Sequence, residues 1–197
     1  MPDAVLLPDG TVLIVSGAAE GSADHSHDAI LEPELFHPEE EKWTRMAEMK
    51  IKRLYHATAI LLPDARVLVG GTTSQYNPEV DTDEFRIQVF SPPYLSKGPQ
   101  PVITSTSTEV SYGDAFDIVT PDAADIESVP LIRPSSVTHS NNMDQRFVGL
   151  EIHSPRDLDK IRVTAPKDAN IAPPGYYMLF IVNGRGIPSV AKFIRLT

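Results

Sequence analysis

Hydrophobic positions along this chain form short runs rich in β-branched residues, and turn residues separate the runs. Leu6–Leu13 shows the pattern, because Pro8, Asp9 and Gly10 divide two apolar stretches that each have the length of a strand. No segment keeps a helical period for long, and the best helical candidate, Ala47–Arg53, is short. The 18 prolines and 11 glycines agree with frequent turns. We therefore predict an all-β protein.

The first part of the chain contains an internal repeat. Leu6–Leu13 recurs as Leu61–Leu68 after 55 residues, and six of the eight positions are identical. Both copies predict a strand, a tight turn and a second strand, after which small residues follow, Ser16-Gly17 and Gly70-Gly71. At such small residues the chain can turn or approach a neighbouring segment closely. The period is close to the ~50 residues of a kelch blade in a β-propeller.

A second pair of similar segments extends the repeat. Glu34–Pro38 in the first copy corresponds to Gln88–Pro92 in the second. In the first copy Lys42–Met46 predicts a fourth strand, and its Trp43 is expected to pack within the blade. The second copy lacks a comparable strand, so we predict a partial kelch propeller of about two blades over residues 1–92. Because propellers close with ~4–8 blades, we expect the chain to be the C-terminal part of a longer protein, with the N-terminal propeller portion missing.

A proline-rich segment ends the repeat. The four prolines of Ser91–Pro101 argue against a central strand, and we predict a linker over residues 93–100. Residues 101–197 predict an immunoglobulin-like β-sandwich, because short strands and turn signals alternate there. The expected strands are Thr108–Ser111, Ala115–Val119, Val129–Ile132, Ser136–His139, Arg146–Glu151, Lys160–Val163, Tyr176–Val182 and Ser189–Leu196.

Net charge and composition exclude several classes of function. The net charge of −10 argues against a nucleic-acid partner, which requires a basic face. No apolar stretch is long enough to span a membrane. The absence of cysteine excludes disulfides, thiolate metal ligands and a cysteine nucleophile. The N-terminus has no basic region and its apolar stretch stops at Pro8, so it does not predict a signal peptide.

Two segments carry candidate metal ligands. Tyr55 and His56 lie just before an apolar run, and His139 lies in a polar loop about eighty residues later, within the predicted sandwich. Two imidazoles and a phenolate suit a tetragonal copper(II) centre, so the three side chains could hold one ion across a domain interface. Neighbours on a regular strand face opposite ways, so Tyr55 and His56 can share a metal only where the backbone is irregular.

Ordinary structural roles compete with metal binding. A tyrosine–histidine pair at a strand start usually packs and hydrogen-bonds, and His139 could cap a turn within its polar loop. We expect Asp144, Gln145 and Arg146 to fix that loop, with the arginine bonded to the aspartate or to a loop carbonyl. Asp24–Asp28 contains two histidines flanked by carboxylates, but a solvated loop explains this segment better than a metal site.

The order of these motifs resembles one known family. Two kelch-like blades, the Arg-Leu-Tyr-His segment at 53–56, the exit segment Val89–Leu95 and the loop Thr138–Arg146 follow one another along the chain. Their order and elements are similar to the C-terminal part of galactose oxidase and glyoxal oxidase, the copper radical oxidases. The resemblance covers essentially the whole chain, and its motifs are fairly specific because they occur on the expected elements.

The resemblance implies an extracellular oxidase that uses one copper ion. The ligands here would be Tyr55, as the axial tyrosine with a catalytic role, together with His56 and His139. The implied reaction oxidises aldehydes or primary alcohols with O₂ and yields H₂O₂. The family's second tyrosine is cross-linked to a cysteine and supplies the second redox equivalent, and this cysteine-free chain has no counterpart for it. We therefore expect the chain alone to be incomplete, able to bind copper but not to turn over.

Two other functions are compatible with the sequence. The blades and the sandwich could form a non-catalytic module that binds a protein or a carbohydrate, because both folds host many functions. The chain could also act as a complementing fragment that docks onto another propeller piece. No motif identifies a substrate, so galactose, glyoxal, methylglyoxal and other small alcohols or aldehydes all stay open.

Overall fold

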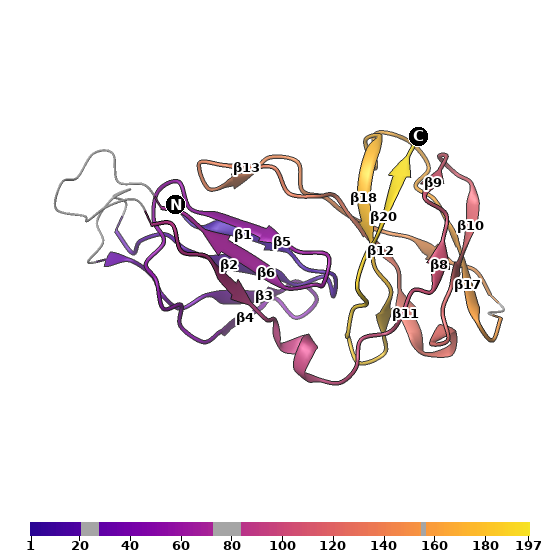
Figure 1. The fold of residues 1–197 in the computed structure, drawn as a ribbon, viewed down its shortest axis with the longest axis horizontal. Coiled ribbons are helices and arrows are strands. Elements are labelled where there is room, and N and C mark those ends of the chain that lie inside the picture. The colour runs from indigo at the N-terminus through magenta and orange to yellow at the C-terminus, as the bar shows by residue number, and fades with distance from the viewer. Residues whose placement is uncertain (21–27, 73–83, 155–156) are drawn as a thin grey trace. The chain divides into compact units, whose positions relative to one another are not determined.

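The computed structural model describes residues 1–20, 28–72, 84–154 and 157–197. Within these ranges, the complete elements are β-strands and two short 3₁₀ helices at Pro93–Ser96 and Ala123–Asp125 (Figure 1). In the described part of the chain, no helix has the length and apolar character needed to cross a membrane. The chain divides into two compact units, which we call unit 1 and unit 2.

Unit 1 comprises Met1–Leu62, Arg66–Phe90 and Ser135–Gln145. It contains two antiparallel sheets in which strands that follow one another in the sequence are neighbours, as in propeller blades (Figure 1). The first sheet has the order β1-β2-β3-β4 and the second has the order β5-β6-β7. The strands are β1 (Asp3–Leu6), β2 (Val12–Val15), β3 (Glu34–His37), β4 (Lys42–Arg45), β5 (Thr58–Leu61), β6 (Val67–Gly70) and β7 (Gln88–Phe90).

The repeated turn joins the first two strands of each sheet. Between β1 and β2, the Gly10 amide donates to the Leu7 carbonyl at 3.0 Å, and the Asp9 carboxylate accepts from the Thr11 amide at 3.1 Å. Gly10 has φ = +85°, which glycine adopts without a steric penalty. The second copy has Ala65 at this position with φ = +66°, so the alanine carries a backbone strain that the glycine avoids.

Alternation along the strands buries one row of side chains in the first sheet. Val5, Leu13 and Val15 are at most 3% exposed, as expected for a strand with one inward face. Asp3 belongs to the same inward row and is only 2% exposed. Burial raises the pKa of its carboxyl to about 7, and the nearby N-terminal amine and Ser16 only partly offset this effect. The carboxyl of Asp3 is therefore half protonated near neutral pH.

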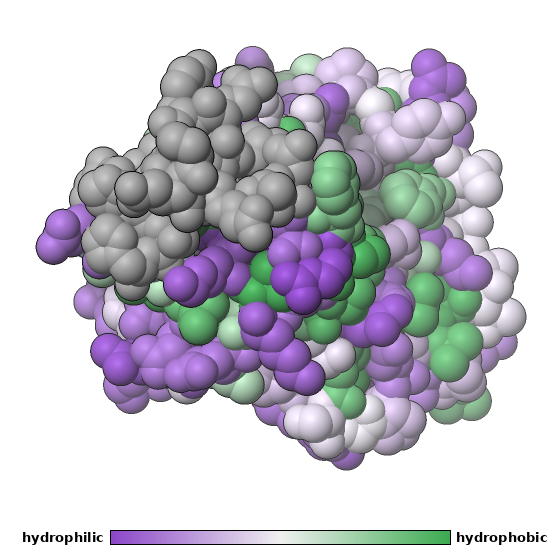
Figure 2. All heavy atoms as spheres, turned by 60° about the vertical axis from the view of Figure 1, so that its left-hand side comes forward, coloured by the Kyte–Doolittle hydropathy of each residue, from purple (hydrophilic) through white to green (hydrophobic). Residues whose placement is uncertain are grey.

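Some apolar side chains of unit 1 lie at the surface. Trp43 on β4 stacks against Phe36 with ring centroids 4.7 Å apart, so it contacts its own blade as expected, yet it is 56% exposed. Phe85 and Ile87, which precede β7, are more exposed still. Figure 2 shows apolar patches between hydrophilic residues on the side of the molecule that comes forward there.

A short hairpin also belongs to unit 1, although it lies in the part of the sequence that predicts a sandwich. Strands β13 (Val137–Thr138) and β14 (Asn141–Asn142) pair antiparallel and form this hairpin. The hairpin contacts β1 and β5, the first strand of each sheet. Residues 135–145 thus group with the blades, and His139 lies in the same unit as Tyr55 and His56.

Unit 2 comprises Pro63–Ala65, Ser91–Pro134 and Arg146–Thr197. One sheet has the order β16-β17-β10-β8, a second has the order β15-β12-β18-β20-β9, and β11 pairs with β19. The strands are β8 (Ser105–Thr106), β9 (Glu109–Val110), β10 (Ala115–Val119), β11 (Ile126–Ser128), β12 (Pro130–Ile132), β15 (Phe147–Gly149), β16 (Glu151–Ile152), β17 (Lys160–Thr164), β18 (Gly175–Leu179), β19 (Val182–Asn183) and β20 (Lys192–Leu196).

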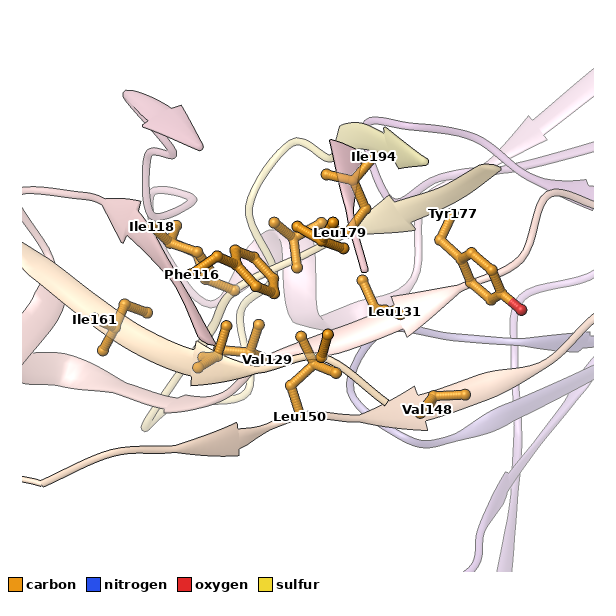
Figure 3. Packing of buried hydrophobic residues seen from close by; sticks show 14 of the residues in the cluster. Phe116, Ile118, Val129, Leu131, Val148, Leu150, Ile161, Tyr177, Leu179 and Ile194 are labelled. Carbon is orange, nitrogen blue, oxygen red and sulfur yellow. The ribbon is translucent and has the colours of Figure 1, made fainter. Parts of the chain in front are cut away.

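Both larger sheets contribute to one hydrophobic core (Figure 3). Phe116 and Ile161 come from one sheet, Leu131 and Leu179 come from the other, and all four are at most 6% exposed. Leu150 is also buried in this core, and it separates β15 in one sheet from β16 in the other. The chain therefore changes sheets at Leu150, and the prediction of one continuous strand over Arg146–Glu151 is wrong.

The proline-rich segment packs within unit 2. Residues 93–100, predicted as a linker, begin with a 3₁₀ helix whose Tyr94 is buried. The Tyr94 hydroxyl donates to the Ala65 carbonyl at 2.5 Å, and the Gln100 amide donates to the Pro188 carbonyl at 2.9 Å. Despite this difference the fold class is confirmed, because the chain is all-β with propeller-like blades followed by a sandwich. The specific assignment to kelch blades stays a prediction.

Candidate metal centre

Three aromatic rings converge within unit 1. The ring centroids of Tyr55 and His56 are 3.9 Å apart, and those of His56 and His139 are 4.7 Å apart. Tyr55 and His139 close the triangle at 5.7 Å. Tyr55 and His56 come from the turn before β5, and His139 comes from the tip of the β13–β14 hairpin. The structure therefore brings together the three side chains that the sequence selected.

A tight turn explains how adjacent residues can face the same point. The Ala57 amide donates to the Leu54 carbonyl at 3.1 Å, which closes a four-residue turn with Tyr55 and His56 at its centre. His56 has φ = +61°, as the third residue of a type II turn has, although glycine is usual there. The positive φ is the backbone irregularity that the sequence required at this pair.

A glycine behind this turn permits its close approach to β6. A Cβ atom on Gly71 would lie 2.7 Å from the His56 carbonyl oxygen and 3.3 Å from the Ala57 Cα atom. Gly71 also has φ = +78°, so two independent reasons favour glycine at this position. The Thr72 hydroxyl donates to the Tyr55 carbonyl and fixes the other peptide of the turn.

Arg53 ties the same turn to the second sheet. Its guanidinium donates to the carbonyls of Gly71 and Arg86, the second at 2.8 Å, and its side chain is fully buried. The Arg53 carbonyl also accepts from the Gly17 amide at 2.8 Å. Burial lowers the pKa of this guanidinium, and the charge of Glu84 acts in the opposite direction. The sequence analysis assigns no separate role to Arg53, although a charged residue beside the two candidate ligands was a usable signal.

The hairpin tip that carries His139 has an unusual backbone. His139 and Ser140 are its two central residues, with φ = +53° and +58°. Two positive φ values define a type I′ turn, for which Asn-Gly is the preferred sequence. Each non-glycine residue in this conformation costs about 1–2 kcal/mol, and such strain is concentrated at functional sites.

The tip also orients the imidazole of His139. Nδ1 of this ring lies 2.7 Å from the Thr138 hydroxyl, so Nε2 is the nitrogen available to a further ligand. A hydrogen bond to the second ring nitrogen is the usual way in which proteins orient a metal-binding histidine. At the base of the hairpin, the Asn142 side chain accepts from the Ser136 amide at 3.0 Å and donates to the Ser135 hydroxyl at 2.9 Å.

Of the three residues expected to fix the loop around His139, Gln145 and Arg146 bond to the backbone of other segments, and the role of Asp144 stays a prediction. The Gln145 side chain bonds the backbone of β1 at Ala4 and Leu6. Arg146 donates to two loop carbonyls, those of Asn170 at 3.3 Å and Ile171 at 2.8 Å.

The donor set suits a transition metal such as copper(II) better than magnesium or calcium. Two imidazole nitrogens and one phenol oxygen form a nitrogen and oxygen set, which suits a tetragonal centre, whereas magnesium and calcium prefer sites built from oxygen alone. Among the described residues, no group of three or more His, Cys, Asp or Glu side chains could hold a metal. A site with three ligands at this place would include the phenol of Tyr55 beside the two imidazoles, and this ligand set stays a prediction.

Other histidines of the chain differ from this cluster. Nε2 of His37 lies 3.2 Å from the Thr44 hydroxyl, and Nε2 of His153 lies 2.6 Å from the Thr164 hydroxyl. Each of these two imidazoles hydrogen-bonds a threonine hydroxyl. His37 is the last residue of β3, and His153 directly follows β16. Both histidines of the segment at 24–28 lie outside the described residues, because the structure does not describe residues 21–27.

Two family models match adjacent parts of the chain. Residues 1–94 match the family model described as glyoxal oxidase N-terminus, and residues 100–196 match the model described as galactose oxidase-like, early set domain. The chain is 38% identical to "Aldehyde oxidase GLOX" of Vitis pseudoreticulata, over all of this chain and 41% of that protein. It is 36% identical to "Galactose oxidase" of Gibberella zeae, over 98% of this chain and 28% of that protein.

A solved structure extends the comparison to three dimensions. It is described as a novel fungal alcohol oxidase with catalytic diversity among the AA5 family, in complex with copper. The TM-score is 0.91 with 34% sequence identity, over all of this chain and 42% of that chain. The chain thus spans less than half the length of each of these relatives. Two adjacent family matches that together span nearly the whole sequence show that the chain belongs to the galactose oxidase and glyoxal oxidase family.

Proposed function

We propose that this chain supplies three protein ligands, Tyr55, His56 and His139, to a copper centre that oxidises small aldehydes or primary alcohols. The observation that carries the proposal is the convergence of their three rings, with centroids 3.9 to 5.7 Å apart, on two turns with positive φ. Family membership supports copper as the ion, since the fungal alcohol oxidase of the same fold is described as a copper complex.

The proposed reaction is a two-electron oxidation by O₂. A primary alcohol gives an aldehyde and H₂O₂, and an aldehyde hydrate gives a carboxylic acid and H₂O₂. Bound copper would supply one redox equivalent and a Lewis acid that holds the substrate oxygen. The two imidazoles would hold the ion, and the Thr138 hydroxyl, 2.7 Å from Nδ1 of His139, leaves Nε2 of that ring for it.

Tyr55 is the residue for which we propose a catalytic role. A phenolate oxygen at the centre can accept the proton that the substrate hydroxyl loses as the alcohol is activated. His56 and Tyr55 are half-buried and His139 is exposed, so a small polar substrate can reach the cluster in unit 1. An extracellular location is part of the same proposal and follows from the family resemblance.

Turnover needs more than this chain contains. The reaction moves two electrons, and a single copper ion changes its charge by one. The chain contains no cysteine, so it cannot supply the cross-linked tyrosine–cysteine pair that the resemblance implies. We therefore propose that copper binding is a property of this chain and that oxidase activity requires further propeller sequence.

Copper(II) titration of the folded chain tests the proposal. The background variant His25→Ala/His27→Ala removes a histidine-rich segment that could bind metal adventitiously. In this background we expect His56→Ala and His139→Ala each to weaken binding at least about tenfold, and nitrogen hyperfine coupling in the copper EPR spectrum to decrease. His37→Ala and His153→Ala serve as matched controls and should bind like the background protein.

If the His56→Ala and His139→Ala variants both bind copper(II) as tightly as the background protein, the shared site does not exist. That result would favour the other function compatible with the fold, a non-catalytic module that binds a protein or a carbohydrate.

A further inference from the structure

Gln145 makes an unusual pair of hydrogen bonds. Its side-chain Nε2 donates to the Ala4 carbonyl at 2.8 Å, and its Oε1 accepts from the Leu6 amide at 3.0 Å. Both backbone groups belong to β1, which pairs with β2 through Ala4–Ile14 and Leu6–Val12. A single amide thus satisfies a backbone acceptor and a backbone donor on the same strand.

The position of β1 in its sheet explains why these groups are available. β1 is the first strand in the order β1-β2-β3-β4, so one of its edges has no neighbouring strand within this sheet. Residues two apart on a strand direct their N–H and C=O groups to the same edge. The primary amide of Gln145 therefore pairs with this edge as one rung of a neighbouring strand would.

Gln145 also occupies a special position in the chain. It is the last residue of the excursion 135–145 that groups with unit 1, and it follows His139 by six residues. The hairpin itself consists of two strands of two residues each, and its tip is exposed at His139. A hairpin this short has little packing of its own and depends on contacts with β1 and β5 for its position.

We propose that Gln145 is a positioning residue of the metal centre. It fixes the hairpin against β1, so that the imidazole of His139 stays next to the Tyr55–His56 turn. The inference rests on the proposed function, because it assigns Gln145 a role in the same site. Residues next to a metal ligand that orient it typically contribute about 10–100-fold to metal affinity.

The test compares Gln145→Met with wild type. Methionine has a similar length and flexibility but can form neither hydrogen bond. We expect copper(II) affinity to fall about tenfold or more, the EPR spectrum to lose the contribution of one nitrogen ligand, and amide exchange at Leu6 to accelerate. Gln100→Met is the matched control, because its side-chain amide also donates to a backbone carbonyl, that of Pro188, but within unit 2. It should bind copper like wild type.

A measurement without metal separates this inference from the proposed function. In the wild-type protein, nuclear Overhauser effects should connect the ring protons of His139 with those of His56, whose centroids are 4.7 Å apart. We expect these signals to disappear in Gln145→Met. If they persist, or if affinity and EPR spectrum match wild type, Gln145 does not position the site. If His139→Ala leaves copper binding unchanged while the signals still depend on Gln145, the proposed function fails and the positioning role stands.

A second variant covers the case in which Gln145→Met does not fold. Gln145→Asn keeps the amide but shortens its reach by one methylene, so it retains the polarity of the site. The same losses in affinity and in ring contacts are expected, with circular dichroism like that of wild type. Full retention of both properties by Gln145→Asn would contradict the proposal.

Discussion

Replacing Gly71 by alanine should disturb the candidate metal centre from behind. The new Cβ atom would lie 2.7 Å from the His56 carbonyl oxygen, which is closer than such atoms approach in proteins. Reaching an ordinary contact of 3.4 Å would require this carbonyl or the alanine to move by about 0.7 Å. The carbonyl belongs to a rigid peptide of the turn that presents His56, so the imidazole moves with it.

The size of the effect follows from two destabilising contributions and one that opposes them. A non-glycine residue at positive φ costs about 1–2 kcal/mol, and overpacking adds about 1–3 kcal/mol. The reduced freedom of the unfolded chain returns about 0.4–1 kcal/mol. We therefore expect the free energy of unfolding of unit 1 to fall by roughly 1–5 kcal/mol. Because metal sites need ligand positions within about 0.5 Å, we also expect copper(II) affinity to fall about tenfold or more.

Urea unfolding followed by tryptophan fluorescence measures the loss of stability. Trp43 is the single tryptophan of the chain and lies in unit 1, so its signal reports that unit. Gly70→Ala is the matched control, because its Cβ atom would meet only the Ile87 side chain, at 3.4 Å. In a strand this change should be neutral or stabilising by up to about 1 kcal/mol. If both variants lose the same stability, or if Gly71→Ala binds copper like wild type, the contact with the turn does not matter.

Two further predictions concern backbone strain and buried charge. Gly10→Ala should lower the free energy of unfolding by about 1 kcal/mol, because Gly10 has positive φ and a Cβ there would meet no atom within 4 Å. Thermal unfolding measures the change, and unaltered or increased stability would contradict the strain argument. Burial of Asp3 raises the pKa of its carboxyl from 3.8 to about 7. Between these two values the folded state keeps a proton that the unfolded state releases, so the free energy of unfolding should fall as the pH rises from about 4 to about 7. At 1.36 kcal/mol per pH unit, the free energy of unfolding should fall by about 4 kcal/mol over this range. Urea unfolding at several pH values measures this dependence, which should be absent in Asp3→Asn. The same pH dependence in Asp3→Asn and wild type would show that the Asp3 carboxyl titrates normally.

Local patterns along the sequence predict much of the fold. The Pro-Asp-Gly turn of the first copy predicts the β1–β2 connection, since each of its residues has a known conformational preference. The small residues after β6 predict a close approach, and Gly71 indeed lies against the His56 carbonyl. Strand boundaries in unit 2 are harder to predict. Leu150 looks like one more strand residue, because a change of sheets leaves no mark in the alternation of apolar positions.

The sequence identifies candidate ligands, but the turns and hydrogen bonds that hold these side chains in place cannot be predicted from it. Tyr55, His56 and His139 become candidates through their donor chemistry together with the resemblance to the copper radical oxidases, because the residues alone more often have structural roles. The type I′ turn at His139 is not visible in the sequence, because His-Ser lacks the glycine or asparagine that usually marks this turn. The bonds from Gln145 to β1 join residues about 140 positions apart, and a single sequence contains no signal for such pairs.

The bond between Leu6 and Gln145 has a consequence for the order of folding. It spans 139 residues, so its formation requires the closure of a very long stretch of chain. Long-range contacts of this kind form late and slowly, because the entropy lost on closure precedes the energy gained. During synthesis, the Tyr55–His56 turn leaves the ribosome well before the His139 hairpin exists. If the chain binds copper as proposed, Tyr55, His56 and His139 come together only after this long-range closure, so the ion would stabilise blades that have already folded rather than initiate their folding.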